Sequence, residues 1–361
     1  MPDTAGRARP VVLMFAGQGA QHPRMAAGLY GREETFTSWM DEAFRLLGPD
    51  GARLREHWLA PEPPPVYHDV TVAQPLLYAV GHALGRLLLD RGVRPAALFG
   101  HSVGELVAAT LAGVLGFADG MRLMRDRMAL FADTPPGGML AVAASVDEVK
   151  DVLGTRVHLA AVNAARQLLL AGERAALDET ARLLGARGLV CRDVLARQAF
   201  HSPVVAEAVQ ASLPVWRDVP LAAPRRPLYS AYTGGPLDPE RARDPEFWAR
   251  QPAETVHFAP TLRAVLDDRP GCLLVEAGPG NSLSALARRQ RAVTTGGGTV
   301  VPLLPDRCRG DDADVRSVER ALRLLAERAA PGGTAAGPPP PPGPPPPGPA
   351  PIRHAATGRT P

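Results

Sequence analysis

Three short apolar runs, each ending in glycine, restrict the fold of this chain more than any other feature. They are VVLMFAGQG, AALFG and CLLVEAGPG, at residues 11–19, 96–100 and 272–280. Such runs are typical of buried strands that end in tight turns. The second and third are followed by the helix-like segments ELVAATLAGVL and SLSALARRQ. Strands that alternate with helices predict a parallel sheet covered by helices, with functional sites at the carboxyl ends of the strands.

The middle of the chain follows a different pattern. The turn-forming sequence TPPGG is followed by six segments that indicate strand, helix, strand, strand, helix and strand: MLAVAAS, DEVKDVLG, VHLAAVN, QLLLAGE, AALDETARLLGARG and LVCRDVL. This order is typical of a ferredoxin-like unit. We therefore predict an α/β protein in which residues 1–134 and 199–330 form a large α/β-hydrolase-like parallel-sheet domain. Residues 135–198 would form an inserted, small ferredoxin-like subdomain.

The C-terminal residues 331–361 are rich in proline and glycine and include PPPPPGPPPPGPAP. Since such a segment cannot bury a core, we predict a disordered tail there. The whole chain of 361 residues is long enough, and with 45% hydrophobic residues apolar enough, for a sizeable core. We find no apolar run of about 18 residues that would span a membrane and no secretory signal in MPDTAGRARP. A cytoplasmic protein without membrane contact is the expectation.

Cysteine and charge patterns exclude several classes of site. The three cysteines, Cys191, Cys272 and Cys308, lack the spacing of metal ligands, so we expect reduced thiols and no metal site. A net charge of +3, no basic runs interleaved with aromatics and only 5% aromatic residues argue against nucleic-acid binding. The mild positive charge would suit an anionic substrate or an acidic partner.

The second glycine turn carries a candidate nucleophile. Residues 100–104, Gly-His-Ser-Val-Gly, match the G-x-S-x-G nucleophile elbow in the required context, after a strand and before a helix. The glycines leave room where the backbone of a sharp turn comes close to its neighbours. The turn presents the Ser102 hydroxyl beside the positive end of the following helix, where an oxyanion would be stabilised. His101 points in another direction and is expected to form part of the pocket wall.

A serine nucleophile needs a general base, and the sequence offers several. His158, His201 and His257 all lie downstream of Ser102, in the order that elbow enzymes require, and spacing does not choose among them. A triad would also need an acid. The candidate acids found between the serine and the histidines, none in an informative context, are Asp147, Asp151, Asp178 and Asp193.

Further motifs accompany the elbow. In chain order they are GQGAQ (17–21), AQP (73–75), GHSVGE (100–105), RMAL (127–130), GGMLAV (137–142), AVN (161–163), AFHSP (199–203) and EAGPG (276–280). With this series the sequence resembles the malonyl-CoA:acyl-carrier-protein transacylase family, especially the acyltransferase domains of modular polyketide synthases. The resemblance extends over about residues 10–305.

The resemblance implies a role for each residue that matches a family motif. Ser102 would be the residue acylated by the CoA thioester, with His201 as its general base. The main-chain carbonyl of Gln251 would orient the imidazole, so that no triad carboxylate is needed. The backbone N–H groups of Val103 and Gln18 would form the oxyanion hole.

The resemblance also implies a substrate. Arg127 would bind the free carboxylate of a malonyl group, for which a planar, permanently charged guanidinium is well suited, and Asn163 would support the site. Residues 198–201, Gln-Ala-Phe-His, match the last three positions of the malonyl-type His-Ala-Phe-His segment and differ from the methylmalonyl-type Tyr-Ala-Ser-His. Phe200 would fill the space that an α-methyl group needs, and Gln198 is the departure from the pattern.

The function implied is that of an [acyl-carrier-protein] S-malonyltransferase in polyketide or fatty acid biosynthesis. It would move malonyl from malonyl-CoA, through acyl-Ser102, to the phosphopantetheine thiol of an acyl carrier protein. No cofactor is expected, because the partner carries the phosphopantetheine. We expect a freestanding enzyme that acts in trans on polyketide synthase modules. The alternatives are an editing acyl hydrolase, an acyltransferase for methylmalonyl or another unit, and a non-catalytic protein that docks carrier proteins.

Overall fold

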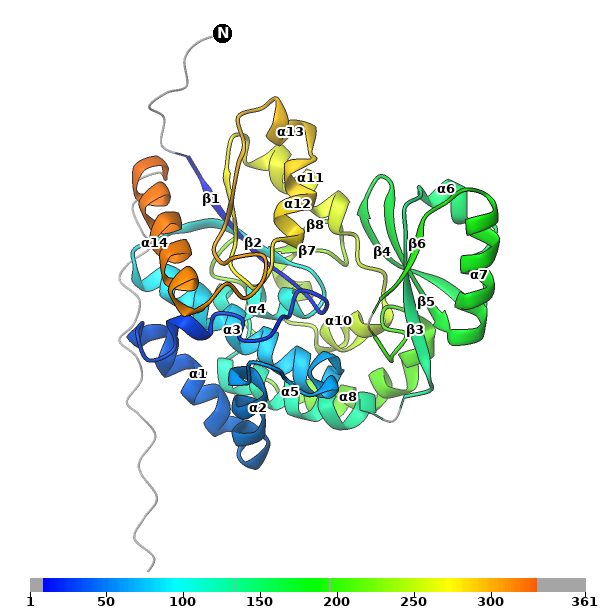
Figure 1. Ribbon diagram of the computed structural model, residues 1–361, viewed down its shortest axis with the longest axis horizontal. Helices are drawn as coiled ribbons and strands as arrows, with labels where there is room; N and C mark the ends of the chain where they lie inside the picture. Colours follow the sequence, from blue (N-terminus) through cyan, green and yellow to red (C-terminus); the bar gives the residue numbers. More distant parts are fainter. Residues whose placement is uncertain (1–8, 133, 195, 330–361) are drawn as a thin grey trace, which may run out of the picture. The chain divides into compact units, whose positions relative to one another are not determined.

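A computed structural model describes residues 9–132, 134–194 and 196–329 (Figure 1). Its main sheet has four parallel strands in the order β10-β9-β1-β2. Their bounds are Val11–Phe15 for β1, Pro95–Gly100 for β2, Leu273–Glu276 for β9 and Thr299–Pro302 for β10. The three glycine turns of the sequence follow β1, β2 and β9, so they meet at one edge of the sheet. The predicted parallel sheet is confirmed.

Helices surround this sheet, as Figure 1 shows. The longer ones are α1 Glu34–Leu47, α2 Pro49–Leu59, α3 Val70–Asp90, α4 Val103–Ala112, α5 Phe117–Ala132, α8 Ala206–Arg217, α11 Phe258–Asp268 and α14 Asp311–Arg328. The shorter ones are α9 Pro239–Ala242, α10 Pro245–Arg250, α12 Ser282–Arg288 and α13 Arg291–Thr294, with 3-10 turns η1 Ala27–Leu29, η2 Pro65–His68, η3 Pro203–Val205 and η4 Gln251–Ala253. A two-stranded ribbon pairs β7 Tyr229–Ser230 with β8 Gly235–Pro236.

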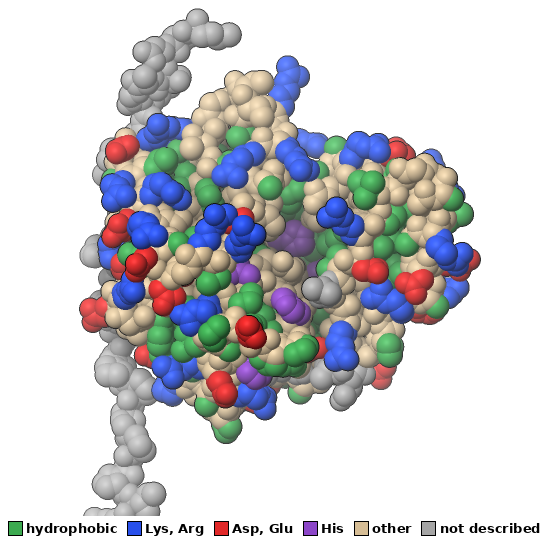
Figure 2. All heavy atoms as spheres, viewed as in Figure 1, with side chains coloured by type: hydrophobic (Ala, Val, Ile, Leu, Met, Phe, Trp, Pro, Cys, Tyr) green, Lys and Arg blue, Asp and Glu red, His purple; other side chains and the backbone are tan. Residues whose placement is uncertain are grey.

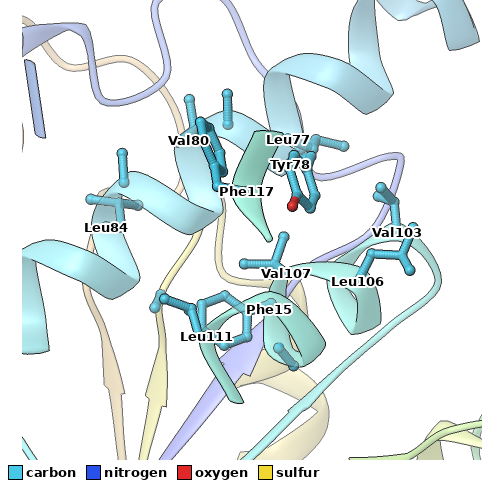
Figure 3. Packing of buried hydrophobic residues seen from close by; sticks show 14 of the residues in the cluster. Phe15, Leu77, Tyr78, Val80, Leu84, Val103, Leu106, Val107, Leu111 and Phe117 are labelled. Carbon is cyan, nitrogen blue, oxygen red and sulfur yellow. The ribbon is translucent and has the colours of Figure 1, made fainter. Parts of the chain in front are cut away.

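The core between α3, α4 and the sheet places the nucleophile turn. Phe15 of β1 lies beneath the two helices, with Tyr78 and Phe117 stacked at 5.7 Å between ring centroids (Figure 3). A Cβ on Gly85 of α3 would meet Leu111 of α4 at 2.3 Å. The missing side chain therefore lets the two helices pack closely, which fixes α4 and the turn in front of it.

Helix α3 corrects one expectation. By length and composition it could cross a membrane, since its most apolar window has a mean hydropathy of 1.2. That window is 94% buried inside the protein, which is typical of the central helix of a folded core. The statement that no segment is apolar enough to span a membrane was thus wrong, because a helix enclosed on all sides is apolar all round.

The middle of the chain forms a second, antiparallel sheet of four strands (Figure 1). Its strands are β3 Gly137–Val142, β4 Val157–Ala164, β5 Gln167–Glu173 and β6 Cys191–Val194, with helices α6 Val146–Val149 and α7 Arg174–Ala186. The strand order β4-β5-β3-β6, with all neighbours antiparallel, is that of the predicted ferredoxin-like unit. The tail predicted at 331–361 lies outside the described residues.

Candidate active site

Ser102 occupies a strained turn between β2 and α4. Its backbone has φ 55° and ψ −123°, a conformation that costs a non-glycine residue on the order of 1–3 kcal/mol. A Cβ on Gly100 would lie 2.1 Å from the carbonyl carbon of Gly104, and one on Gly104 would lie 2.1 Å from the Phe15 oxygen. Both glycines of the motif are therefore required by close backbone packing, and the turn is the elbow that the sequence predicts.

His201 is the histidine that reaches Ser102. Its Nε2 lies 2.9 Å from the Ser102 Oγ, and its Nδ1 lies 3.2 Å from the Gln251 carbonyl oxygen and 3.0 Å from that of Glu254. An Nδ1–H that donates to these carbonyls leaves Nε2 free to accept the serine proton. Neither His158 nor His257 lines the pocket around Ser102.

His201 is buried, with only 5% of its surface exposed. Burial lowers the pKa of its imidazole to about 3, and the neighbouring His101 and Arg127 act in the same direction, against the two carbonyl hydrogen bonds. At neutral pH the ring is therefore uncharged, which is the form that accepts a proton.

The first glycine turn lies against the nucleophile. A Cβ on Gly17 would lie 2.5 Å from the His101 carbonyl oxygen and 3.2 Å from the Ser102 Cβ. This close approach brings Gln18 next to the elbow, where Val103 begins α4. The side chain of Gln18 accepts a hydrogen bond from Gln74 Nε2 at 3.1 Å. The oxyanion-hole role of the Gln18 and Val103 N–H groups stays a prediction, with both residues placed beside Ser102.

A narrow pocket opens at Ser102. It is lined by Gln74, Ser102, Arg127, Phe200, His201, Tyr232, Gln251 and Pro252. Figure 2 shows histidine side chains at the centre of one face of the molecule, one of them in a hollow that Lys and Arg side chains surround. The pocket walls thus combine a nucleophile, a base and a cation.

Arg127, on α5, is the charged group of this pocket and is 8% exposed. Its Nη1 lies 3.4 Å from Gln74 Oε1, and within the described part of the chain no carboxylate lies within 4.0 Å of its guanidinium. Burial lowers its pKa to about 10, so that it stays charged at neutral pH. A buried cation without a counter-ion is costly, and a bound anion would compensate it.

The other predicted substrate residues divide into two groups. Phe200 lines the pocket and packs against Phe131, with 5.2 Å between ring centroids. Gln198 donates from its side chain to the Phe131 carbonyl at 3.2 Å, and His101 Nε2 lies 2.8 Å from Asn163 Oδ1. These three polar residues are not among those that line the pocket, and their side chains are engaged in the contacts just named.

Sequence reasoning missed four residues of the site. Gln74 lies in the AQP motif, which was noticed without a role. Glu254 shares the Nδ1 hydrogen of His201, and Tyr232 stands with its ring centroid 6.1 Å from that of His201. Glu254 is three residues after the predicted Gln251 and contributes through its main-chain carbonyl, for which the residue type carries no signal. Tyr232 had no local signal, since it comes from a segment with no quoted motif. Glu105 was the last letter of a quoted motif, and its carboxyl is fully buried behind the site.

Comparison with known proteins gives consistent matches. The profile of the family described as acyl transferase domain matches residues 12–320. Polyketide synthase GfsB of Streptomyces halstedii is 35% identical over 317 residues, which are 86% of this chain and 6% of that synthase. The chain therefore spans a small fraction of the length of that relative.

Solved structures agree. The acyl transferase domain of SpnD in complex with 2-(pent-4-yn-1-yl)malonyl matches with a TM-score of 0.82 and 30% identity, over 91% of this chain and 79% of that one. The malonyl-CoA:acyl carrier protein transacylase FabD of Xanthomonas oryzae matches with a TM-score of 0.75 and 26% identity, over 87% of this chain and 98% of that one.

Proposed function

The chain belongs to the acyl transferase domain family, and we propose that it transfers malonyl from malonyl-CoA to the phosphopantetheine thiol of an acyl carrier protein. The observation that carries this proposal is the buried Arg127, which faces the same narrow pocket as Ser102 and has no carboxylate partner among the described residues. An acyl group with a second, free carboxylate supplies that charge. A plain acetyl group would leave the cation buried and unpaired.

The proposed reaction has two halves. In the first, His201 Nε2 takes the Ser102 proton while Oγ attacks the thioester carbonyl, and the resulting oxyanion is held by the N–H groups of Val103 and Gln18. The carbon–sulfur bond then breaks, and the imidazolium returns the proton to the CoA sulfur. In the second half the carrier thiol gives its proton to His201 as its sulfur attacks the ester carbonyl. The bond between that carbon and Ser102 Oγ then breaks, and the imidazolium returns the proton to Oγ, which restores the free serine and the neutral base.

Pocket width supports malonyl over branched units. Phe200 and Tyr232 both form walls of the pocket, beside the base and the guanidinium. Aromatic rings in these two walls would leave little room for an α-substituent on the acyl group. One methyl group is worth about 1–3 kcal/mol of discrimination, so selection for malonyl would be strong and incomplete.

We propose further that the protein acts in trans on polyketide synthase modules. The support for synthase modules as partners is the similarity of the chain to polyketide synthases such as GfsB. An editing hydrolase would use the same serine and histidine, but it would have less use for a buried arginine in the acyl pocket.

The test is to mix the protein with malonyl-CoA and to measure its intact mass, then to add a carrier protein bearing phosphopantetheine. We expect a stable malonyl adduct that is absent in Ser102→Ala and that passes to the carrier. Rapid release of free malonate without carrier loading would instead identify a hydrolase. A protein that no CoA thioester acylates would refute both enzymes.

A further inference from the structure

A buried carboxyl lies directly behind the candidate site and has no role in the proposed reaction. Glu105 follows Ser102 by one turn of α4, and none of its surface is exposed. It does not line the pocket. Burying a carboxyl is costly unless its oxygens are hydrogen-bonded, so the partners of Glu105 indicate what its burial secures.

Both oxygens have partners from distant parts of the chain. Oε1 accepts a hydrogen bond from Gln251 Nε2 at 3.1 Å, and Oε2 accepts one from the Ala231 backbone N–H at 2.8 Å. Burial raises the pKa of the carboxyl to about 8, while hydrogen bonding by the Ser230 side chain, the Ala231 N–H and the Gln251 amide acts in the opposite direction. Glu105 therefore joins the nucleophile helix to two segments more than a hundred residues away.

One of these bonds completes a closed path through the site. Glu105 binds the side chain of Gln251, the carbonyl of Gln251 faces His201 Nδ1 at 3.2 Å, and His201 Nε2 lies 2.9 Å from Ser102 Oγ. Ser102 leads back to Glu105 through the first turn of α4. The path has three hydrogen bonds and one helical turn, and each member is fixed by its two neighbours.

The other fully buried glutamate provides a contrast. Glu276, at the end of β9, accepts hydrogen bonds from the backbone N–H groups of Leu283 and Ser284, where α12 begins. Those bonds satisfy the open N-terminus of a nearby helix, which is sufficient reason for its burial. Glu105 instead accepts one side-chain amide, and that amide belongs to the residue whose carbonyl faces the base.

We propose that Glu105 is a positioning residue for acyl transfer, which fixes the carbonyl of Gln251 and thereby the orientation of His201 toward Ser102. In a Ser-His-Asp triad the acid orients the histidine by a direct hydrogen bond. Glu105 would have the same effect indirectly, through the main-chain carbonyl of Gln251. This inference rests on the proposed function only in that Ser102 is the nucleophile and His201 its base.

The experiment measures how fast Ser102 reacts with a fluorophosphonate, a probe that needs an activated serine but no acyl substrate. Glu105→Leu removes both acceptors, and Gln251→Met removes the amide donor while it keeps the main-chain carbonyl. We expect each variant to label about tenfold more slowly than the parent. This is the lower end of the loss of activity that is typical when a residue that orients a functional group is removed. Labelling is compared at a temperature where circular dichroism shows every protein folded.

The double variant separates positioning from general damage. If Glu105 acts through the Gln251 amide, Glu105→Leu with Gln251→Met labels no more slowly than the slower single variant, because the same link is already broken. Glu105→Gln should label at close to the parental rate, unlike Glu105→Leu. Its amide can form both hydrogen bonds once the Gln251 side-chain amide rotates by half a turn. Glu276→Leu is the matched control, which lowers the melting temperature while its labelling rate stays within about twofold of the parent.

The inference would be overturned if Glu105→Leu or Gln251→Met labelled at the parental rate. It would also be overturned if the double variant were slowed by the product of the two single-variant factors. The Gln251→Met measurement tests the inference even if Glu105→Leu does not fold. The same proteins are then titrated with malonyl-CoA, where we expect kcat to fall and KM to change little, because the Arg127 side of the pocket is intact. A parent that labels with the probe but never accepts malonyl refutes the proposed function and leaves this inference standing.

Discussion

At the scale of single residues, the proposed choice of acyl group depends on Arg127. Its guanidinium is buried among neutral walls and keeps its charge, so the free energy of burying it is offset only when an anion binds. The position of this charge in the same pocket as Ser102 is the basis for our proposal that the acyl group carries a second carboxylate.

Replacement of Arg127 by alanine should therefore invert the substrate preference. Loss of the partner of a buried carboxylate costs about 3 kcal/mol or more, so we expect acylation by malonyl-CoA to slow by roughly a hundredfold or more. Acylation by acetyl-CoA should be retained or increase. The measurement is a competition between equimolar thioesters, followed by intact mass. Arg125→Ala is the control, since its side chain is 51% exposed on the same helix; an unchanged preference in Arg127→Ala would remove this residue from the site.

The base makes a second prediction, on pH. Because burial lowers the pKa of His201 to about 3, its neutral form persists well below the usual histidine pKa of 6.5. Acylation of Ser102 should thus stay nearly constant as pH falls from 7 to 5. The same shift weakens the fold in that range, because the unfolded chain binds a proton there that the native imidazole does not. Rates at pH values where the protein is folded test this, and half-loss of the rate near pH 6.5 would contradict it.

At the scale of elements, the unit of β2, turn and α4 depends on backbone packing against β1. A Cβ on Gly104 would lie 2.1 Å from the oxygen and 2.6 Å from the carbon of the Phe15 carbonyl group. Backbone atoms of a central strand cannot move aside as a flexible side chain can. This contact explains why the motif ends in glycine.

Gly104→Ala should consequently displace α4 and with it Ser102. Overpacking of this kind costs about 1–3 kcal/mol, and we expect a lower melting temperature together with a loss of Ser102 acylation. Gly185→Ala, in α7, is the matched change. No heavy atom lies within 4 Å of the added Cβ there, so this variant should be stabilised by about 0.5–1 kcal/mol. Melting curves and malonyl-adduct formation test both variants, and a fully active, equally stable Gly104→Ala would refute the packing argument.

At the scale of the whole molecule, the site needs both sheets. The main sheet presents Ser102 at its carboxyl edge, and the chain that leaves β6 of the small sheet presents His201. Two backbone hydrogen bonds join strand β4 of the small sheet to the segment before α11: Val162 N–H donates to the Val256 carbonyl at 2.8 Å, and Val256 N–H donates to the Ala160 carbonyl at 2.9 Å. Val256 follows Glu254 by two residues, so the edge of the small sheet holds the segment that orients the base.

The sequence by itself determined the features that adjacent residues specify. Apolar runs ending in glycine predict β1, β2 and β9 of the parallel sheet, whereas β10 has no such ending and was not predicted. The six segments of 135–198 predict the ferredoxin-like unit, and the G-x-S-x-G spacing predicts the elbow. These follow from side-chain periodicity and from the close approach of backbone in a tight turn, both of which act over a few residues.

Only the tertiary structure decided which distant residues meet. Ser102 and His201 are 99 residues apart, and Glu105 and Gln251 are 146 apart. Residue spacing left three histidines open as the base, and the search for an acid considered four aspartates while Glu105 stood three residues after the serine. Gln198 and Asn163 were expected at the substrate, yet Gln198 binds the Phe131 carbonyl and Asn163 binds His101, and neither lines the pocket. The reason is physical: a local pattern fixes the direction of a strand or helix, whereas contacts between segments depend on how all of them pack.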